Sequence, residues 1–282
     1  MPCSPSSSQR SGSDVAGNSD QDPIIRLRGI RNAFGKQVIH NNLDLDVRRG
    51  EIIALVGGSG TGKSVLLRTI VGLNRPAAGS IEVFGQDILH LAPQERRKVE
   101  QRWGILFQNG ALFSSLTVAQ NIQVPLKEHL GLKGPMLEEI AALKIALAGL
   151  PPEAGAKYPA ELSGGMRKRA GLARALALDP EIVFLDEPTA GLDPIGAADF
   201  DQLIADLRDT VGFTVFLVTH DLDTLATVCD RIAVLGEKRV MVVGTMAEML
   251  EQTNPWIVDY FHGPRGRAAM AAKARNDARG AP

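Results

Sequence analysis

The chain has 282 residues, of which 44% are hydrophobic and 22% charged, a composition typical of a globular protein with an ample core. Its formal net charge of −1 gives no general electrostatic support for nucleic-acid binding, and no apolar run approaches the roughly 20 residues that cross a bilayer. Two cysteines cannot build a disulfide framework, and the N-terminus lacks an apolar secretory core, which predicts a protein of the reducing cytosol.

The N-terminal part of the chain divides into a polar tail and a β-rich segment. Residues 1–22 are rich in Ser, Gly, Pro and Asp, which predicts a disordered tail. Ile24–Val47 contains alternating apolar residues and is predicted to form strands with a turn near Phe34. An aromatic side chain on a turn either packs locally or stacks on a nucleotide base, and the residues alone leave both interpretations open.

The stretch that follows carries the clearest chemical pattern. Apolar residues Ile52–Val56 predict a buried strand, and after a glycine-rich turn a helix is expected from Lys63 to about Gly72. In this setting the pattern G-x-x-x-x-G-K-[ST] cradles phosphates with backbone N–H groups and the Lys63 ammonium, while the Ser64 hydroxyl is a ligand for Mg²⁺. The predicted phosphate-binding residues are Gly57, Gly58, Ser59, Gly60, Thr61, Gly62, Lys63, Ser64 and Val65.

The middle of the chain is predicted to be a helical insert, at about residues 109–176, in an α/β domain. Strands are predicted at 80–85 and 104–107 before it, and helical patterns follow. Near its end Ser163 is expected to cap a helix that ends at Asp179. Gly164 and Gly165 expose N–H groups that a second anion can approach, although an ordinary capped helix start would have the same residues.

Two further strands end in polar residues. The run 181–187 (EIVFLDE) is typical of a central parallel strand, and its carboxylates Asp186 and Glu187 follow four large apolar residues. Ligands of open α/β sheets bind at this edge, so we expect Asp186 to hold Mg²⁺ through water and Glu187 to deprotonate the attacking water. The strand Thr214–Thr219 ends in the same way, which predicts that His220 reaches the γ-phosphate or the water.

The C-terminal region contains a strand pair at 231–237 and 239–244, a helix at about 247–252, and the aromatic segment PWIVDYF. Trp256 and Tyr260 are spaced i, i+4 on a possible helix. They pack either on this chain's own domain or on a partner, and the sequence leaves both interpretations open. Residues 263–282 form a basic tail rich in Ala and Gly.

Taken in order, these motifs resemble those of ABC-transporter ATPase subunits over about residues 24–253. The motifs are the phosphate loop, Gln108, the LSGGM segment, the FLDE strand end, the residues Ala190–Asp193 and His220. The resemblance implies binding of ATP with Mg²⁺, ATP hydrolysis, and a homodimer of ATPase subunits.

The same resemblance implies roles for residues outside the phosphate loop. Phe34 would be the adenine-stacking position, where this family often has Tyr, and Gln108 would sense Mg²⁺ and link to the permease. Asp193 would lie at the dimer interface, and His220 at the γ-phosphate. The second subunit's contacts with the γ-phosphate would come from Ser163, Gly164 and Gly165.

Within that family the chain is similar to the ATP-binding subunits of Mla-type phospholipid transporters. The likeness rests on residues 107–129 (FQNGALFSSLTVAQNIQVPLKEH), on LSGGMRKRAGLARALAL and on the aromatic ending. It implies an integral-membrane permease, an MCE-domain lipid-binding protein and a small STAS-domain subunit as partners, at the cytoplasmic face of the inner membrane. The alternatives are an importer ATPase for another substrate such as an amino acid, or an ABC ATPase that acts on ribosomes or DNA.

The expected fold is therefore α/β, with a RecA-like P-loop core on a mostly parallel sheet, an antiparallel β subdomain and a helical insert. We expect three regions along the chain, which are the tail (1–22), the ATPase domain (23–253) and a C-terminal aromatic segment with a basic tail (254–282).

Overall fold

The computed structural model describes residues 23–108, 110–263 and 266, and the predicted N-terminal tail and most of the basic C-terminal tail lie outside these residues. Its strands form a six-stranded and a four-stranded sheet. None of the helices in the described part of the chain is long and apolar enough to cross a membrane. The strands are β1 (Pro23–Phe34), β2 (Gln37–Arg48), β3 (Ile52–Gly57), β4 (Ala78–Val83), β5 (Gln86–Asp87), β6 (Trp103–Leu106), β7 (Ile182–Asp186), β8 (Thr214–Val218), β9 (Arg231–Gly236) and β10 (Arg239–Gly244).

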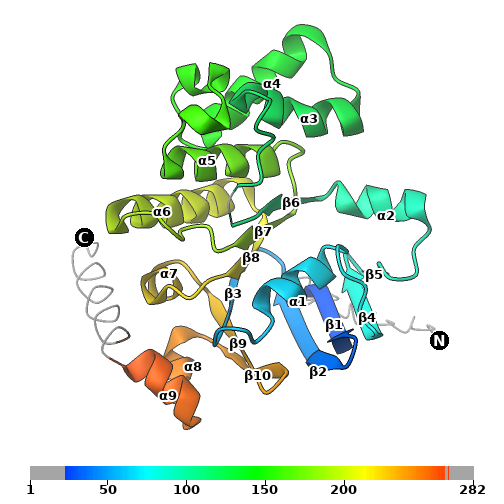
Figure 1. The fold of residues 1–282 in the computed structure, drawn as a ribbon, viewed down its shortest axis with the longest axis vertical. Coiled ribbons are helices and arrows are strands. Elements are labelled where there is room, and N and C mark those ends of the chain that lie inside the picture. Colours follow the sequence, from blue (N-terminus) through cyan, green and yellow to red (C-terminus); the bar gives the residue numbers. More distant parts are fainter. Residues whose placement is uncertain (1–22, 109, 264–265, 267–282) are drawn as a thin grey trace, which may run out of the picture.

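The helices separate these strands along the chain (Figure 1). The α-helices are α1 (Lys63–Ile70), α2 (Pro93–Glu100), α3 (Val118–Leu130), α4 (Gly134–Leu147), α5 (Gly164–Ala175), α6 (Pro194–Val211), α7 (Leu222–Thr227), α8 (Met246–Leu250) and α9 (Pro255–His262), and the short 3₁₀ helices are η1 (Pro152–Ala156) and η2 (Pro159–Glu161).

The six-stranded sheet has the order β10-β9-β3-β8-β7-β6. Its five strands from β9 to β6 are parallel, and only β10 is antiparallel to its neighbour. Strands β3, β7 and β8 are buried along their whole length, as expected for parallel strands covered on both faces. Because they run in the same direction, the loops after β3, β7 and β8 meet at one edge of the sheet.

The four-stranded sheet and the helical cluster correspond to the two expected subdomains. The four-stranded antiparallel sheet, of order β2-β1-β4-β5, shares a core with α1 and one face of the main sheet. Helices α3, α4 and α5 build a separate apolar cluster, and they gather at one end of the molecule in Figure 1. The predicted α/β fold with an antiparallel β subdomain and a helical insert is confirmed.

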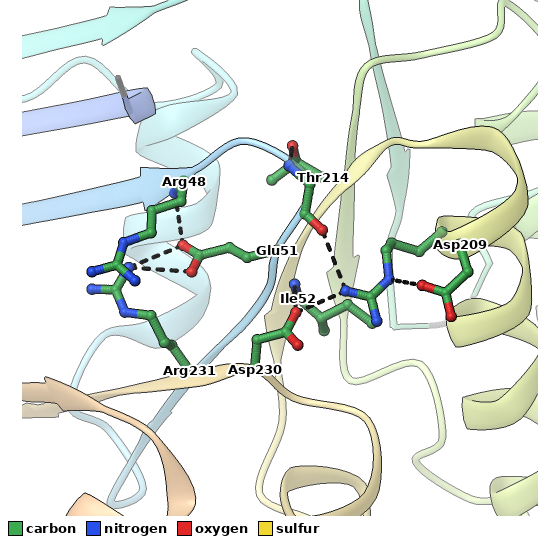
Figure 2. A network of polar contacts seen from close by, with 9 residues as sticks. Arg48, Glu51, Ile52, Asp209, Thr214, Asp230 and Arg231 are labelled. Atoms are coloured by element: carbon green, nitrogen blue, oxygen red, sulfur yellow. Dashed lines mark hydrogen bonds and ion pairs between the residues drawn. The ribbon is translucent and has the colours of Figure 1, made fainter. Parts of the chain in front are cut away.

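A polar network lies at the amino ends of the central strands (Figure 2). The carboxylate of Glu51 accepts hydrogen bonds from the Arg48 N–H (2.7 Å) and from Arg231 (3.1 and 3.2 Å). Burial raises the pKa of Glu51, and these donors oppose that rise. Asp230 accepts a hydrogen bond from the N–H of Ile52 at 2.7 Å, and this bond ties the start of β3 to the residue that precedes β9.

Three α-helices, α2, α6 and α7, were not predicted from the sequence. Helix α2 lies in a charged stretch and buries only Val99, so it has no apolar stripe that would reveal it. Helix α6 does carry signals, because Asp193 caps it, a proline occupies its first turn, and it buries an apolar stripe that includes Phe200 and Ile204.

Candidate functional site

The phosphate loop joins β3 to α1, and close packing fixes its conformation. A Cβ placed on Gly57 would lie 2.4 Å from the carbonyl oxygen of Leu235 in β9, which leaves room only for glycine. Gly62, the N-cap of α1, has φ +100° and lies against Ile39 and His40 of β2. No side chain caps α1, so its first N–H groups are available to a bound anion.

Lys63 folds back over this loop. Its Nζ donates hydrogen bonds to the carbonyl oxygens of Gly57 (2.8 Å) and Gly58 (3.1 Å). Burial lowers the pKa of Lys63, and the nearby carboxylates of Glu187 and Asp186 oppose that effect. The ammonium is therefore already placed at the mouth of the loop before any phosphate arrives.

The structure brings Ser64 and Asp186 together, although they are far apart in the sequence. Ser64 Oγ donates to Asp186 Oδ1 at 3.2 Å, and Asp186 is almost fully buried at the end of β7. Burial raises the pKa of Asp186, and the hydrogen bond from Ser64 opposes this rise. A hydroxyl next to a carboxylate is an oxygen pair of the type that Mg²⁺ prefers.

Glu187 lies between Gln108 and His220. Its Oε2 accepts a hydrogen bond from Gln108 Nε2 at 3.1 Å, and its Oε1 lies 3.5 Å from His220 Nδ1. The Glu187 backbone has φ +48°, an uncommon value for a residue with a side chain. The loops after three neighbouring strands thus place one amide, one carboxylate and one imidazole together, and the sequence predicted the carboxylate and the imidazole at this edge of the sheet.

Lys168, on α5, was missed in the sequence analysis. Its Nζ donates to the main-chain carbonyl of Gln108 and, at 3.0 Å, to that of Glu187. This side chain is buried, and burial lowers its pKa. It therefore fixes the backbone of the two residues whose side chains meet at the site. Within a run of basic residues, only the three-dimensional contacts distinguish it from its neighbours.

The residues predicted to bind a second anion lie on a different surface. Ser163 caps α5 by accepting a hydrogen bond from the N–H of Met166 (3.2 Å), and both Ser163 and Gly164 are exposed. Gly164 borders a cavity of about 320 Å³ that Gly191 and Leu192 also line. No hydrogen bond or ion pair between described residues joins Ser163–Gly165 to the phosphate loop. In Figure 1, α5 lies with the helical layer, apart from the loop between β3 and α1.

Asp193 and Phe34 are the remaining predicted site residues. Asp193 caps α6, since its Oδ1 accepts from the N–H groups of Ile195 (3.1 Å) and Gly196 (2.9 Å). Phe34 ends β1, and 54% of its surface is exposed. Its hairpin also contains Ile39 and His40, which contact the phosphate loop at Gly62.

The comparison with protein families matches residues 40–190 to the ABC transporter model, a range that includes the phosphate loop, Gln108, the α5 start and both carboxylates. The chain belongs to the ABC transporter family. It is an ATP-binding and ATP-hydrolysing subunit of such a transporter, as the sequence motifs predicted.

The relatives of this ABC ATPase differ in the transported substrate that their names state. It is 40% identical over 241 residues to the probable ribonucleotide transport ATP-binding protein mkl of Mycobacterium leprae, covering 86% of this chain and 69% of that one. It is 37% identical over 240 residues to the intermembrane phospholipid transport system ATP-binding protein MlaF of Haemophilus influenzae, covering 85% of this chain and 90% of MlaF. It is 41% identical over 242 residues to the methionine import ATP-binding protein MetN of Lacticaseibacillus paracasei, covering 84% and 67%.

Among solved structures, a dimeric post-hydrolysis state of the ATP-binding cassette MJ0796 with ADP and Pi superposes on the ABC ATPase with a TM-score of 0.72. The sequence identity is 28%, and the match covers 78% of this chain and 98% of that one. The structure of cbiO1 from Clostridium perfringens, part of the transporter complex cbiONQ, matches at a TM-score of 0.73 and 26% identity, covering 90% and 100%.

Proposed function

We propose that this ABC ATPase drives phospholipid transport between the inner and outer membranes, as a pair of copies held by a permease at the cytoplasmic face of the inner membrane. The observation that carries the proposal is the match to the Haemophilus influenzae MlaF protein, whose name states intermembrane phospholipid transport and of whose length 90% is covered. The methionine importer MetN is 41% identical, which makes import of an amino acid the second candidate.

Nucleotide binding starts at the phosphate loop. The N–H groups at the start of α1 and the loop amides bind phosphate oxygens, with Gly57–Val65 forming the cradle. Lys63 then exchanges the carbonyl oxygens of Gly57 and Gly58 for β- and γ-phosphate oxygens. Because those bonds already hold the ammonium at the loop, little side-chain freedom is lost on binding.

The oxygen pair of Ser64 and Asp186 fits Mg²⁺. The hydroxyl would bind the ion directly, Asp186 would hold it through water, and Gln108 would sense its presence. Bound Mg²⁺ neutralises charge on the β- and γ-phosphates. Binding of the ion would replace the hydrogen bond between Ser64 and Asp186.

Glu187 is the general base in this proposal. Its carboxylate takes the proton of the attacking water while the oxygen of that water approaches the γ-phosphorus. Gln108 and His220 contact opposite oxygens of the carboxylate and so fix its orientation. His220 also reaches the γ-phosphate, which loses its bond to the leaving ADP.

A second copy of the chain completes the site. Ser163 and Gly164 are exposed, and no described hydrogen bond or ion pair joins Ser163–Gly165 to their own phosphate loop, so we assign these residues to the γ-phosphate bound by the other copy. Asp193, which follows the cavity-lining residue Leu192 in the chain, lies at the interface between copies, and Phe34 stacks on adenine. The match to a dimeric cassette with ADP and Pi supports this arrangement.

The proposed partners are the permease, an MCE-domain lipid-binding protein and a small STAS-domain subunit. The ATPase unit spans residues 23–253 with its helical insert at 109–176. The segment from residue 254 onward would contribute to assembly, although its helix α9 packs on this chain's own core.

The test is purification of the tagged, full-length chain with its permease from native membranes. Mass spectrometry of the bound lipids and ATPase assays with phospholipid vesicles, methionine and ribonucleotides follow. We expect co-purified phospholipid and ATPase activity that responds to the vesicles. A response to methionine or a ribonucleotide, with none to phospholipid, would reject phospholipid transport and leave the ATPase assignment unchanged.

A further inference from the structure

Helix α9 is anchored on the core directly beneath the nucleotide site. Asn254 caps it by accepting a hydrogen bond from the N–H of Trp256 at 3.0 Å, and Pro255 occupies its first position. Ile257 and Phe261 are fully buried in a cluster that includes Val56 of β3 and residues of α7. The helix is therefore fixed to the strand that ends in the phosphate loop and to the helix that follows His220.

Next to these two residues on α9, Trp256 and Tyr260 form an aromatic pair that packs against the same cluster. The rings of Trp256 and Tyr260 stack with their centroids 4.9 Å apart and an interplanar angle of 16°. Tyr260 also contacts the ring of Phe261 edge-on at 5.0 Å, and Phe261 is part of the core. The position of the pair is thus set by packing and not by solvent-exposed side-chain rotamers.

This pair touches both loops that must meet the γ-phosphate. The Tyr260 hydroxyl donates a hydrogen bond to the main-chain carbonyl of His220 at 3.1 Å. A Cβ placed on Gly58 of the phosphate loop would lie 3.8 Å from the indole Nε1 of Trp256, so the indole borders that loop. One stacked unit therefore spans from the phosphate loop to the His220 loop.

His220 needs such support because few contacts hold its side chain in place. The imidazole is 63% exposed, and its Nδ1 lies 3.5 Å from Glu187 Oε1. The direction of the side chain consequently depends on its backbone. Burial, with a smaller contribution from Asp221, raises the pKa of Tyr260 to about 12, which keeps the hydroxyl protonated and able to donate at any physiological pH.

We propose that Tyr260 is a positioning residue for ATP hydrolysis. Its hydroxyl holds the His220 backbone, while Trp256 sets the distance between that backbone and the phosphate loop. This inference rests on the proposed role of His220 at the γ-phosphate. It assigns to α9 a role in turnover, separate from complex assembly.

The experiment compares Tyr260→Phe with Asp259→Asn in the full-length chain bound to its permease. Tyr260→Phe keeps the ring and removes only the hydroxyl, whereas Asp259 is exposed on the same helix. We expect kcat to fall about five- to tenfold in Tyr260→Phe, the loss of one hydrogen bond, with unchanged KM for ATP and unchanged Tm. Asp259→Asn is expected to match the native protein. An unchanged kcat in Tyr260→Phe would overturn the inference, as would a parallel loss of Tm and ATP affinity.

A double-mutant cycle separates this inference from the role of His220 itself. His220→Ala should slow hydrolysis strongly, and Tyr260→Phe should then have no further effect, because the residue that it positions is gone. If His220→Ala leaves kcat unchanged, the proposed role of His220 fails. If His220→Ala is slow but the Tyr260→Phe effect persists in that background, the role of His220 stands and the positioning role of Tyr260 is rejected.

Discussion

Two glycine-rich helix starts in this ABC ATPase differ in what surrounds them. The start of α1 is enclosed by its own chain, with Gly57 against β9 and Gly62 against β2, and no side chain caps it. The start of α5 is exposed, is capped by Ser163, and has nothing within 4 Å of a Cβ placed on Gly164. Both helix ends attract anions. The first is enclosed within the chain, and the second lies on an exposed surface, where we propose that a second copy of the chain binds.

Glu187→Gln gives the largest expected effect and tests the inward site. The side chain keeps its shape and its contact with Gln108 but can no longer take a proton, so we expect kcat to fall at least about 100-fold while ATP still binds. The outward α5 start should then stay engaged, and light scattering should show an ATP-dependent dimer. Normal turnover in this variant would remove Glu187 from the role of general base.

Gly164→Asp tests the outward helix start. The backbone there accepts a side chain without strain, so folding should be unaffected, while a carboxylate would repel the partner's γ-phosphate. We expect at least about tenfold slower hydrolysis with unchanged ATP affinity, and little effect from Gly164→Ala. Mixing Gly164→Asp with Lys63→Ala should recover part of the activity, because a mixed pair has one intact composite site. No recovery would argue that each chain works alone.

Lys168→Met tests how the two helix starts communicate. Lys168 lies one turn into α5 yet bonds the backbones of Gln108 and Glu187. Removing its charge while keeping its length should lower kcat about tenfold, and Lys168→Arg should restore most of it. Steady-state ATPase assays provide the measurement. Equal activity of the Met and Arg variants with the native protein would show that the outward helix does not affect the inward site.

Asp201→Asn is expected to act on stability and its pH dependence. Asp201 of α6 accepts a hydrogen bond from Thr224 of α7 (2.6 Å), and burial raises its pKa to about 7. Because the folded-state pKa exceeds the ordinary value of 3.8, the native chain binds this proton more tightly than the unfolded chain. The contribution of Asp201 to stability is therefore full below about pH 4 and is lost as the pH rises to about 7.

Urea unfolding at pH 5 and pH 8 measures this contribution. The native protein should lose about 2 to 3 kcal/mol more than Asp201→Asn over this interval, while the exposed Asp199→Asn should follow the native protein. The same pH dependence in Asp201→Asn and the native protein would show that Asp201 does not titrate in this range.

Much of the site could be predicted because its motifs are local in sequence. The phosphate loop, the carboxylates after β7 and His220 after β8 each follow a buried apolar strand, and parallel strands bring such ends together. That rule predicts that the loop before Ser64 and the carboxylate of Asp186 lie at the same edge of the sheet.

The remaining features depend on contacts between segments distant in sequence. In the sequence Lys168 cannot be distinguished from its basic neighbours, because only its hydrogen bonds to main-chain carbonyls set it apart. Tyr260 lies forty residues after His220, so their contact cannot be read from local sequence. Trp256 and Tyr260 could be placed on one helix face from their spacing, but which surface that face covers depends on the packing of Ile257 and Phe261. Helix α2 has no apolar periodicity, because solvent surrounds nearly all of it.

The place of Trp256 gives this ABC ATPase an intrinsic optical reporter. The chain has two tryptophans, and the other, Trp103, is buried in the sheet against Phe184. Only the indole of Trp256 borders the phosphate loop, at Gly58. Nucleotide binding should therefore change the emission of Trp256 and leave that of Trp103 nearly constant, so that the unlabelled chain reports its own occupancy in a stopped-flow fluorimeter.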